Sequence, residues 1–130
     1  MSGLRFLDLF DVLEIHHSRI ELYGGIEGVR DIGMLQSALA QPQAGSGEKL
    51  FHKDIFEMAS AYWFHIARNH PFLDGNKRTA LAACLVFLDL NGYEIFANSD
   101  DLENFTVAIS AGLTDKDRAA EFLKKYAKVI

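Results

Sequence analysis

The sequence predicts an all-α fold, a compact bundle of about six helices around a central buried helix, with little or no strand. Three observations predict it. Apolar residues recur at helical spacing along most of the 130-residue chain. Aspartate or serine precedes most of these stretches, as expected of helix N-caps, and glycine or proline follows several of them. The length fits one domain that spans residues 1–130.

The first third of the chain predicts two helices separated by a glycine-rich stretch. The i, i+3, i+4 and i+7 spacing of Leu9, Val12, Leu13, His16, Ile20 and Tyr23 predicts an amphipathic helix over about residues 4–22. Residues 23–30 are rich in glycine and predict a loop or a short hairpin. Asp31 can cap a short helix to about Gln41, which Pro42 helps to stop. Residues 43–50 predict a loop.

Two longer helices are predicted in the middle of the chain. Asp54 and Glu57 form a capping-box pair at the start of the first. It should end near residue 69, because Pro71 disfavours helical geometry for the residue before it. The second begins at Gly75 or Asn76 and ends at Asn91–Gly92. Because residues 80–88 are apolar on nearly every side, this is the expected central buried helix.

The remainder of the chain predicts a short extended piece and two more helices. Residues 93–97 form the extended piece. The two helices are expected from Ser99 or Asp100 to about Ala111, and from Thr114 or Asp115 to about Ala127.

Composition and charge exclude several classes of protein. Apolar residues at 49%, charged residues at 24% and only 2 prolines exclude a disordered chain. The net charge of −5 argues against a nucleic-acid-binding surface, although not against a small phosphate site. The longest apolar run, Ala80–Leu88, is too short for a membrane span of roughly 20 residues. The start of the chain is not a convincing signal peptide, and Cys84 alone, in an apolar run, predicts a buried thiol. We therefore expect a cytoplasmic protein without direct nucleic-acid or membrane contacts.

Residues 70–78, with the sequence HPFLDGNKR, carry the strongest indication of chemistry. They lie between the end of one predicted helix and the start of the next, where free backbone N–H groups attract anions. Gly75 allows a bound group to approach the backbone. Lys77 and Arg78 stand where the helix dipole disfavours cations by about 0.3–1 kcal/mol each. A bound phosphate would reverse the sign of this cost, so the pair indicates a functional site.

Other residues of the same segment complete a site for phosphoryl chemistry. Asp74 offers an oxygen ligand for Mg²⁺, and Asn76 can hydrogen-bond a phosphate oxygen. His70 can accept a proton near neutral pH, and Phe72 would anchor the loop in the core. Each residue alone also has an ordinary structural explanation: a dipole-stabilised histidine, an N-cap, a core phenylalanine or surface cations. It is their combination within nine residues that predicts a site.

The segment resembles the signature of the Fic/Doc superfamily, His-x-Phe-x-(Asp/Glu)-Gly-Asn-x-Arg, without a gap. Lys77 replaces a glycine that is usual in Fic adenylyltransferases, and Leu81 replaces a second arginine. Both departures resemble the death-on-curing (Doc) branch of toxin–antitoxin toxins, whereas Gly75 is Fic-like. The resemblance extends over about residues 9–125, through the glycine-rich stretch, residues 35–39 and residues 87–92.

The resemblance implies a role for each matching residue. His70 would be the general base, Asp74 would hold Mg²⁺, and Arg78 would clamp phosphates. Gly75, Asn76 and Lys77 would form the anion-binding turn, with Lys77 and Arg78 acting in catalysis. A Doc-type toxin would pass the γ-phosphate of ATP to a protein hydroxyl, such as a threonine of elongation factor Tu, and inhibit translation. The alternatives are transfer of AMP, as in Fic enzymes, and a catalytically idle helical binding domain.

Further expectations concern a target flap and regulation. The resemblance implies that the glycine-rich stretch is a flap that aligns the target protein, although a plain connection has the same composition. Its residues are Tyr23, Gly24, Gly25, Gly28 and Arg30, and Arg30 is expected to pair with Asp31. The implied partner is an antitoxin whose disordered segment folds into a groove on the toxin.

A second pattern on the chain concerns self-inhibition. Ser99, Glu103 and Asn104 match the self-inhibitory pattern of Fic enzymes, in which the glutamate blocks the γ-phosphate site. Asp100 and Glu103 equally fit a capping box. The remaining histidines have no metal-ligand spacing. His16 and His17 are expected to be packed or at the surface, His65 at the edge of the core and His52 exposed.

Overall fold

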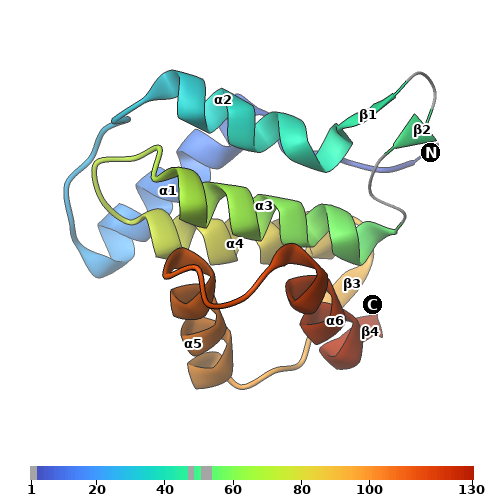
Figure 1. Ribbon diagram of the computed structural model, residues 1–130. Helices are drawn as coiled ribbons and strands as arrows, with labels where there is room; N and C mark the ends of the chain where they lie inside the picture. The colour runs from blue at the N-terminus through green and yellow to red at the C-terminus, as the bar shows by residue number, and fades with distance from the viewer. Residues whose placement is uncertain (1–2, 47–48, 51–53) are drawn as a thin grey trace.

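The computed structural model describes residues 3–46, 49–50 and 54–130. These residues form six α-helices, one 3₁₀-helix and two small two-stranded sheets, so the predicted all-α class is confirmed (Figure 1). The helices are α1 (Leu9–Tyr23), α2 (Ile32–Ala40), η1 (Gln41–Gln43), α3 (Ile55–Asn69), α4 (Asn76–Leu90), α5 (Ser99–Ser110) and α6 (Lys116–Tyr126). The antiparallel strand pairs are β1 (Gly45–Ser46) with β2 (Lys49–Leu50), and β3 (Tyr93–Ile95) with β4 (Ala127–Val129).

Helices α3 and α4 together occupy the centre of the bundle. They pack against each other, with α2 on one side of α3 and α5 and α6 on the other, while α1 packs on α4 (Figure 1). The large side chains that are fully buried come mostly from this pair and include Tyr62, Trp63, Ile66 and Phe87. The helix expected at the centre therefore shares that place with the helix before it. Burial raises the pKa of the Cys84 thiol on α4, as expected for a structural cysteine.

The N-terminal segment departs from the predicted helix, which begins at Leu9 instead of residue 4. Asn91 holds the backbone of Arg5 in an extended conformation through hydrogen bonds of 2.9 Å to its N–H and its carbonyl. The Leu7 N–H donates to the Tyr62 hydroxyl at 2.8 Å. Because these tertiary partners already bind the backbone of residues 5 and 7, those residues do not join the helix. The helix starts after Asp8, which forms a capping box with Asp11.

The C-terminal residues also differ from the prediction. Helix α6 ends at Tyr126, and the next three residues pair with β3 in the register Tyr93↔Val129 and Ile95↔Ala127. The extended piece expected at residues 93–97 thus finds a partner strand that the sequence did not indicate. Residues 43–50, expected as a loop, include the last residue of η1 and the β1–β2 pair. His52 lies outside the described residues.

The helix caps follow the predicted chemistry with one shift. Asp31, Asp54 and Asp115 cap α2, α3 and α6 as expected, and α4 stops at Asn91–Gly92. Helix α5 begins at Ser99, as expected, but its N-cap is Asn98, whose side chain accepts the hydrogen bond from the Asp100 N–H. Within the described ranges, no helix has the length and apolar character needed to cross a membrane.

Candidate functional site

The loop from residue 70 to residue 75 joins the two central helices, and His70 begins it. His70 is the C-cap of α3 with φ 49° and ψ 54°, and it is the one non-glycine residue with positive φ in the part of the chain that the structure describes. A side chain in this left-handed region costs free energy, and glycine is the usual residue at such a helix end. The histidine is exposed. A strained, exposed imidazole at the start of the loop indicates a function for its side chain.

Phe72 and Asn76 hold the middle of the loop. The Asn76 amide accepts from the Phe72 N–H at 2.9 Å and donates to the Phe72 carbonyl at 3.0 Å. Phe72 is 1% exposed and stacks on the His16 ring with 3.8 Å between the ring centres. Both polar ends of the Asn76 side chain are therefore engaged inside the loop. The Asn76 NH2 group keeps a second N–H, so its side-chain bond to a phosphate, expected from the sequence, stays a prediction.

His16 on α1 contacts the loop, although the sequence predicted only a packed or surface histidine. Its ring is 4% exposed, and its Nε2 lies 2.8 Å from the Asp74 carbonyl oxygen. Together with its stacking on Phe72, this contact fixes the loop against α1. The available signal was a histidine in the apolar stripe between Val12 and Ile20, where a polar ring needs a partner once buried.

Asp74 connects the loop to the glycine-rich stretch. One oxygen of its carboxylate accepts from the Gly75 N–H at 2.8 Å, and the other accepts from the Ile26 N–H at 3.1 Å. A Cβ atom on Gly25 would lie 2.7 Å from the Asp74 carboxylate, so a residue with a side chain does not fit there. Asp74 is exposed and keeps lone pairs for a further ligand.

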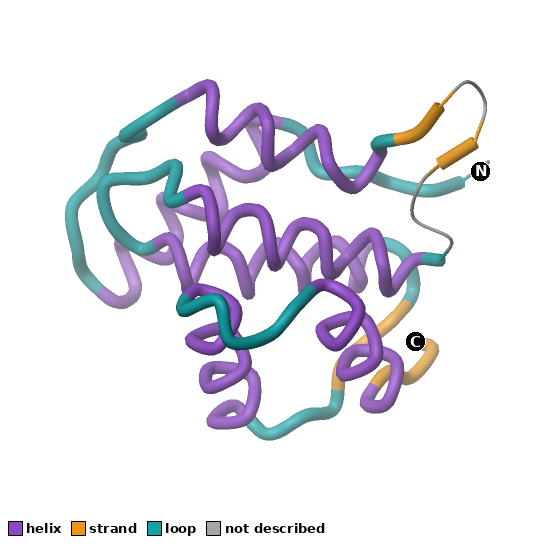
Figure 2. Tube along the Cα trace, in the orientation of Figure 1, coloured by secondary structure: helices purple, strands orange, loops and turns teal. Residues whose placement is uncertain are grey.

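The glycine-rich stretch lies beside the loop along most of its length. The Leu73 N–H donates to the Gly28 carbonyl at 3.0 Å, and the Arg30 N–H donates to the Pro71 carbonyl at 2.7 Å. The two connections lie side by side at one end of the bundle (Figure 2). The stretch of residues 23–30, which we call the flap, therefore lies beside the loop that carries His70 and Asp74, and its role in aligning a target stays a prediction.

The expected ion pair between Arg30 and Asp31 is wrong, because each side chain has another partner. The Arg30 guanidinium donates to the His70 carbonyl at 2.7 Å and to the Asn69 carbonyl at 3.0 Å. Asp31 accepts from the Met34 N–H as the cap of α2. Arg30 thus caps the C-terminal carbonyls of α3 and fixes the backbone of His70.

A second contact ties the flap to α1. His17 hydrogen-bonds the Glu27 carboxylate through Nδ1 and lies 3.2 Å from the Glu21 carboxylate through Nε2. The hydrogen bond and charge of Glu27, with those of Glu21, raise the pKa of His17 above its usual range. His17 is exposed, whereas its neighbour His16 is packed.

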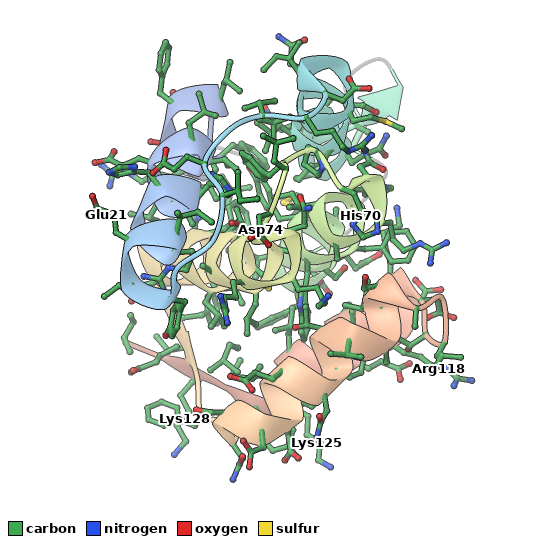
Figure 3. All side chains as sticks on the ribbon, turned by 90° about the vertical axis from the view of Figure 1, so that its left-hand side faces the viewer. Glu21, His70, Asp74, Arg118, Lys125 and Lys128 are labelled. Atoms are coloured by element: carbon green, nitrogen blue, oxygen red, sulfur yellow. The ribbon has the colours of Figure 1, made fainter. Side chains whose placement is uncertain are left out.

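The first turn of α4 has the features of an anion site. Its N-cap is Gly75, with φ 74°, which offers no side chain to accept from the free N–H groups of the turn. No acidic residue lies in that turn, and the side chains of Lys77 and Arg78 are exposed. Figure 3 shows Asp74 at this end of α4, with His70 at the end of α3. The positive end of the α4 dipole and the charges of Lys77 and Arg78 therefore act together at the first turn of α4.

A pocket of about 490 Å³ opens beside this turn, between α1, α4 and α5. Its polar lining residues are Arg19, Tyr23, Lys77, Arg78, Glu103 and Thr106, and its apolar lining residues are Leu81, Ala82, Leu85 and Val107. The Arg78 guanidinium lies over the Tyr23 ring, 4.8 Å from its centre. His70 and Asp74 do not line the pocket; they lie on the loop that leads to its basic end. Its size falls within the range of small-molecule sites, roughly 300–1,000 Å³.

The suspected regulatory residues separate in the structure. Glu103 faces the pocket from α5, whereas Ser99 and Asn104 do not line it. The predicted capping box is absent from this helix start, because Asn98 is the cap. A self-inhibitory role for Glu103 stays a prediction.

Comparisons with known proteins agree with this geometry. Residues 6–88, which include α1 to α3 and most of α4, match the model of the Fic/DOC family. The chain is 32% identical over 122 residues to "Protein kinase doc" of Escherichia phage P1, covering 94% of this chain and 95% of the relative. It is 42% identical over 78 residues to "Toxin Doc" of Mycolicibacterium smegmatis, covering 60% of each chain. The match spans the loop, the flap and the first turn of α4, and the chain belongs to the Fic/DOC family.

Proposed function

We propose that this protein is a Doc-type toxin that transfers the γ-phosphate of Mg-ATP to a protein hydroxyl in the cytoplasm and thereby inhibits translation. One observation carries the proposal: a glycine-capped helix start with two cations and no acidic residue opens onto a pocket of nucleotide size, next to a strained histidine. The printed names of the relatives, a protein kinase and a toxin, support it. The proposed target is a threonine of elongation factor Tu.

The residues of the loop supply the steps of such a transfer. His70 would take the proton from the target hydroxyl while the oxygen forms a bond to the γ-phosphorus. The bond from that phosphorus to the bridging oxygen breaks, and ADP leaves. Lys77, Arg78 and the N–H groups of the turn would hold the phosphate charge that develops. The flap would present the target backbone alongside residues 70–73.

Asp74 fits the role of a magnesium ligand. Its carboxylate is exposed, and each oxygen accepts one backbone N–H with a lone pair to spare. Among the described residues, no group of three or more metal-ligating side chains surrounds a common point. This suits Mg²⁺, which takes one or two carboxylates and completes its shell with water and substrate phosphates. The ion would neutralise phosphate charge during transfer.

A pair of labelled nucleotides tests the reaction. The protein is incubated with a cell lysate and ATP labelled at either the γ- or the α-phosphate. We expect label on protein from the γ-position only, and none from either position with His70→Ala. Label from the α-position alone would establish adenylyl transfer instead. Binding of Mg-ATP without any transfer would establish an idle binding domain.

The antitoxin belongs to the same proposal. A second cavity of about 550 Å³ lies between α1 and α4, lined largely by apolar residues that include Ile15, Val86 and Leu90, and it shares Arg19, Ala82 and Leu85 with the pocket. A disordered segment that folds on binding could bury its apolar side chains there. We expect Leu90→Glu to weaken neutralisation by the co-expressed antitoxin, without loss of γ-label transfer. Leu113→Glu, an exposed leucine outside both cavities, is the control.

A further inference from the structure

Arg19 on α1 lines the pocket beside the first turn of α4. It lines the same space as Lys77 and Arg78, although it lies 58 or more positions earlier in the chain. No feature of the motif at residues 70–78 points to it. The proposed transfer reaction, as derived above, does not use it.

The Arg19 guanidinium is partly desolvated and incompletely paired. Its Nε is buried and has no hydrogen-bond partner among the described residues, while one terminal nitrogen donates to the Ser18 hydroxyl at 3.1 Å. A buried donor without a partner costs free energy that a ligand can recover by accepting from it. Few native side chains retain such a group without a structural or ligand-binding reason.

Tyr23 brings Arg19 and Arg78 to one ring. Residue 23 lies four positions after residue 19, so the two side chains share a face of α1. The Arg19 guanidinium carbon lies 5.7 Å from the centre of the Tyr23 ring, and that of Arg78 lies 4.8 Å from it. Attraction to the ring orients both guanidinium groups at the pocket.

The charges of the pocket are unbalanced. Its lining holds Arg19, Lys77 and Arg78 against one carboxylate, that of Glu103. None of the three cations forms an ion pair with a carboxylate in the described part of the chain. Three cations that share one partly enclosed space repel one another unless an anion lies between them. With Glu103 counted, the lining has an excess of two positive charges, which the net negative charge of Mg-ATP would balance.

We propose that Arg19 is a third phosphate-binding residue, which completes from α1 the site that Lys77 and Arg78 form on α4. The inference rests on the proposed function, since it takes the polyphosphate of ATP as the ligand. A guanidinium suits this role, because it donates two parallel hydrogen bonds to phosphate oxygens and stays charged. The triphosphate is then held between α1 and α4.

The affinity for Mg-ATP tests this assignment. Arg19→Gln removes the charge, Arg19→Lys keeps it without the planar fork, and Arg78→Gln tests the site of the proposed function. Arg118→Gln is the matched control, because Arg118 is exposed on α6 and lies away from Asp74 (Figure 3). Thermal melting of each variant verifies that it folds. Binding is measured by calorimetry at one fixed salt concentration, since the interaction is electrostatic.

We expect Arg19→Gln to weaken Mg-ATP binding about tenfold, Arg19→Lys to recover part of the loss, and Arg118→Gln to match the unsubstituted protein. An Arg19→Gln affinity within about twofold of Arg118→Gln would overturn the inference, while a loss with Arg78→Gln would leave the proposed function intact. If Arg19→Lys and Arg19→Gln both bind more weakly than Arg118→Gln and to the same extent, the planar guanidinium carries the contact, which supports the assignment. If the unsubstituted protein does not bind Mg-ATP, both proposals fail.

Discussion

The described helices begin in two ways, which differ in whether the N-cap side chain accepts a hydrogen bond from the free N–H groups of the first turn. In the described residues, five helices begin at Asp or Asn, whose side chain accepts from an N–H of the first turn: Asp8, Asp31, Asp54, Asn98 and Asp115. Helix α4 begins at Gly75, which has none, and continues with Lys77 and Arg78. The first kind satisfies its own free N–H groups and helix dipole. The α4 start has no such acceptor of its own, and it is the end of the fold where we propose that phosphate binds.

The same contrast holds at the opposite ends of helices. Beyond α4, the chain leaves through Gly92 with φ 91°, where nothing obstructs a side chain but the backbone conformation favours glycine. Beyond α3, it leaves through His70 in a similar left-handed conformation. The end of α4 has the residue that stability favours, whereas the end of α3 has the histidine that we propose as the general base. Substitutions that exchange these features test the distinction.

The largest effect is expected from His70→Gly. The imidazole that accepts the hydroxyl proton is lost, so the rate of γ-label transfer should fall at least about 100-fold. This is the usual size of a general base's contribution to the rate. The loop should survive, because Arg30 bonds to the backbone carbonyl of residue 70 and not to its side chain. The free energy of unfolding should stay the same or rise by about 0.4–1 kcal/mol, as glycine suits the left-handed region.

Urea unfolding and the transfer assay, run on the same preparation, check this prediction. Gly92→Ala is the control at the other helix end, and it should lose about 1 kcal/mol of stability because alanine does not suit a positive φ. A destabilised His70→Gly protein would show that the histidine is held for structural reasons.

A smaller effect is expected when α4 receives a cap of its own. Gly75→Asp places a carboxylate at the N-cap, next to Lys77 and Arg78, where it competes with the phosphate groups. Gly75→Asn is the control, because asparagine has nearly the shape of aspartate without its charge. Both variants bear the same cost of a positive φ and of a Cβ 3.1 Å from the Ile20 side chain. We expect Gly75→Asp to bind Mg-ATP at least about tenfold more weakly than Gly75→Asn. Equal affinities would contradict a phosphate site at this helix start.

The sequence predicted the local features of the molecule better than its distant contacts. The signature at residues 70–78, the aspartate caps and the helix periodicity are visible within short windows, and the structure has all six expected helices among its described residues. The roles of His16 and Arg30 depend on residues that lie 40 or more positions away, through the Asp74 and His70 carbonyls. Their partners are backbone atoms, which leave no trace in the pattern of residue types.

The same reason explains the errors at the ends of the chain. The start of α1 is set by Asn91 and Tyr62, and the end of α6 is set by pairing with β3, none of which is near in sequence. Element boundaries depend on such tertiary partners more than on helix propensity. Arg19 shows the limit most clearly, since only folding brings it to a pocket formed mainly by α4 and α5.

An ordinary cap should affect stability alone. Asp115 accepts from the Arg118 N–H at 2.9 Å at the start of α6, away from the pocket. Asp115→Ala removes this acceptor and should lower the free energy of unfolding by about 1 kcal/mol, the typical worth of an N-cap. Affinity for Mg-ATP should not change. Chemical unfolding and calorimetry check the two statements, and a fall in affinity without loss of stability would remove the distinction between the two kinds of helix start.

The smallest effect concerns the link between α1 and the flap. Glu27 and Glu21 raise the pKa of His17 above its ordinary value of 6.5, so the charged pair stabilises the folded state fully below that pH and is lost as pH rises through the higher folded pKa. The flap amides should therefore exchange with solvent faster, relative to intrinsic rates, at pH values above the His17 titration. In Glu27→Gln, the His17 midpoint seen by NMR should move down towards 6.5. Glu94→Gln, an exposed glutamate on β3, should leave that midpoint unchanged. The midpoint measures the contact directly, because exposure to solvent keeps its contribution to stability too small to detect by unfolding.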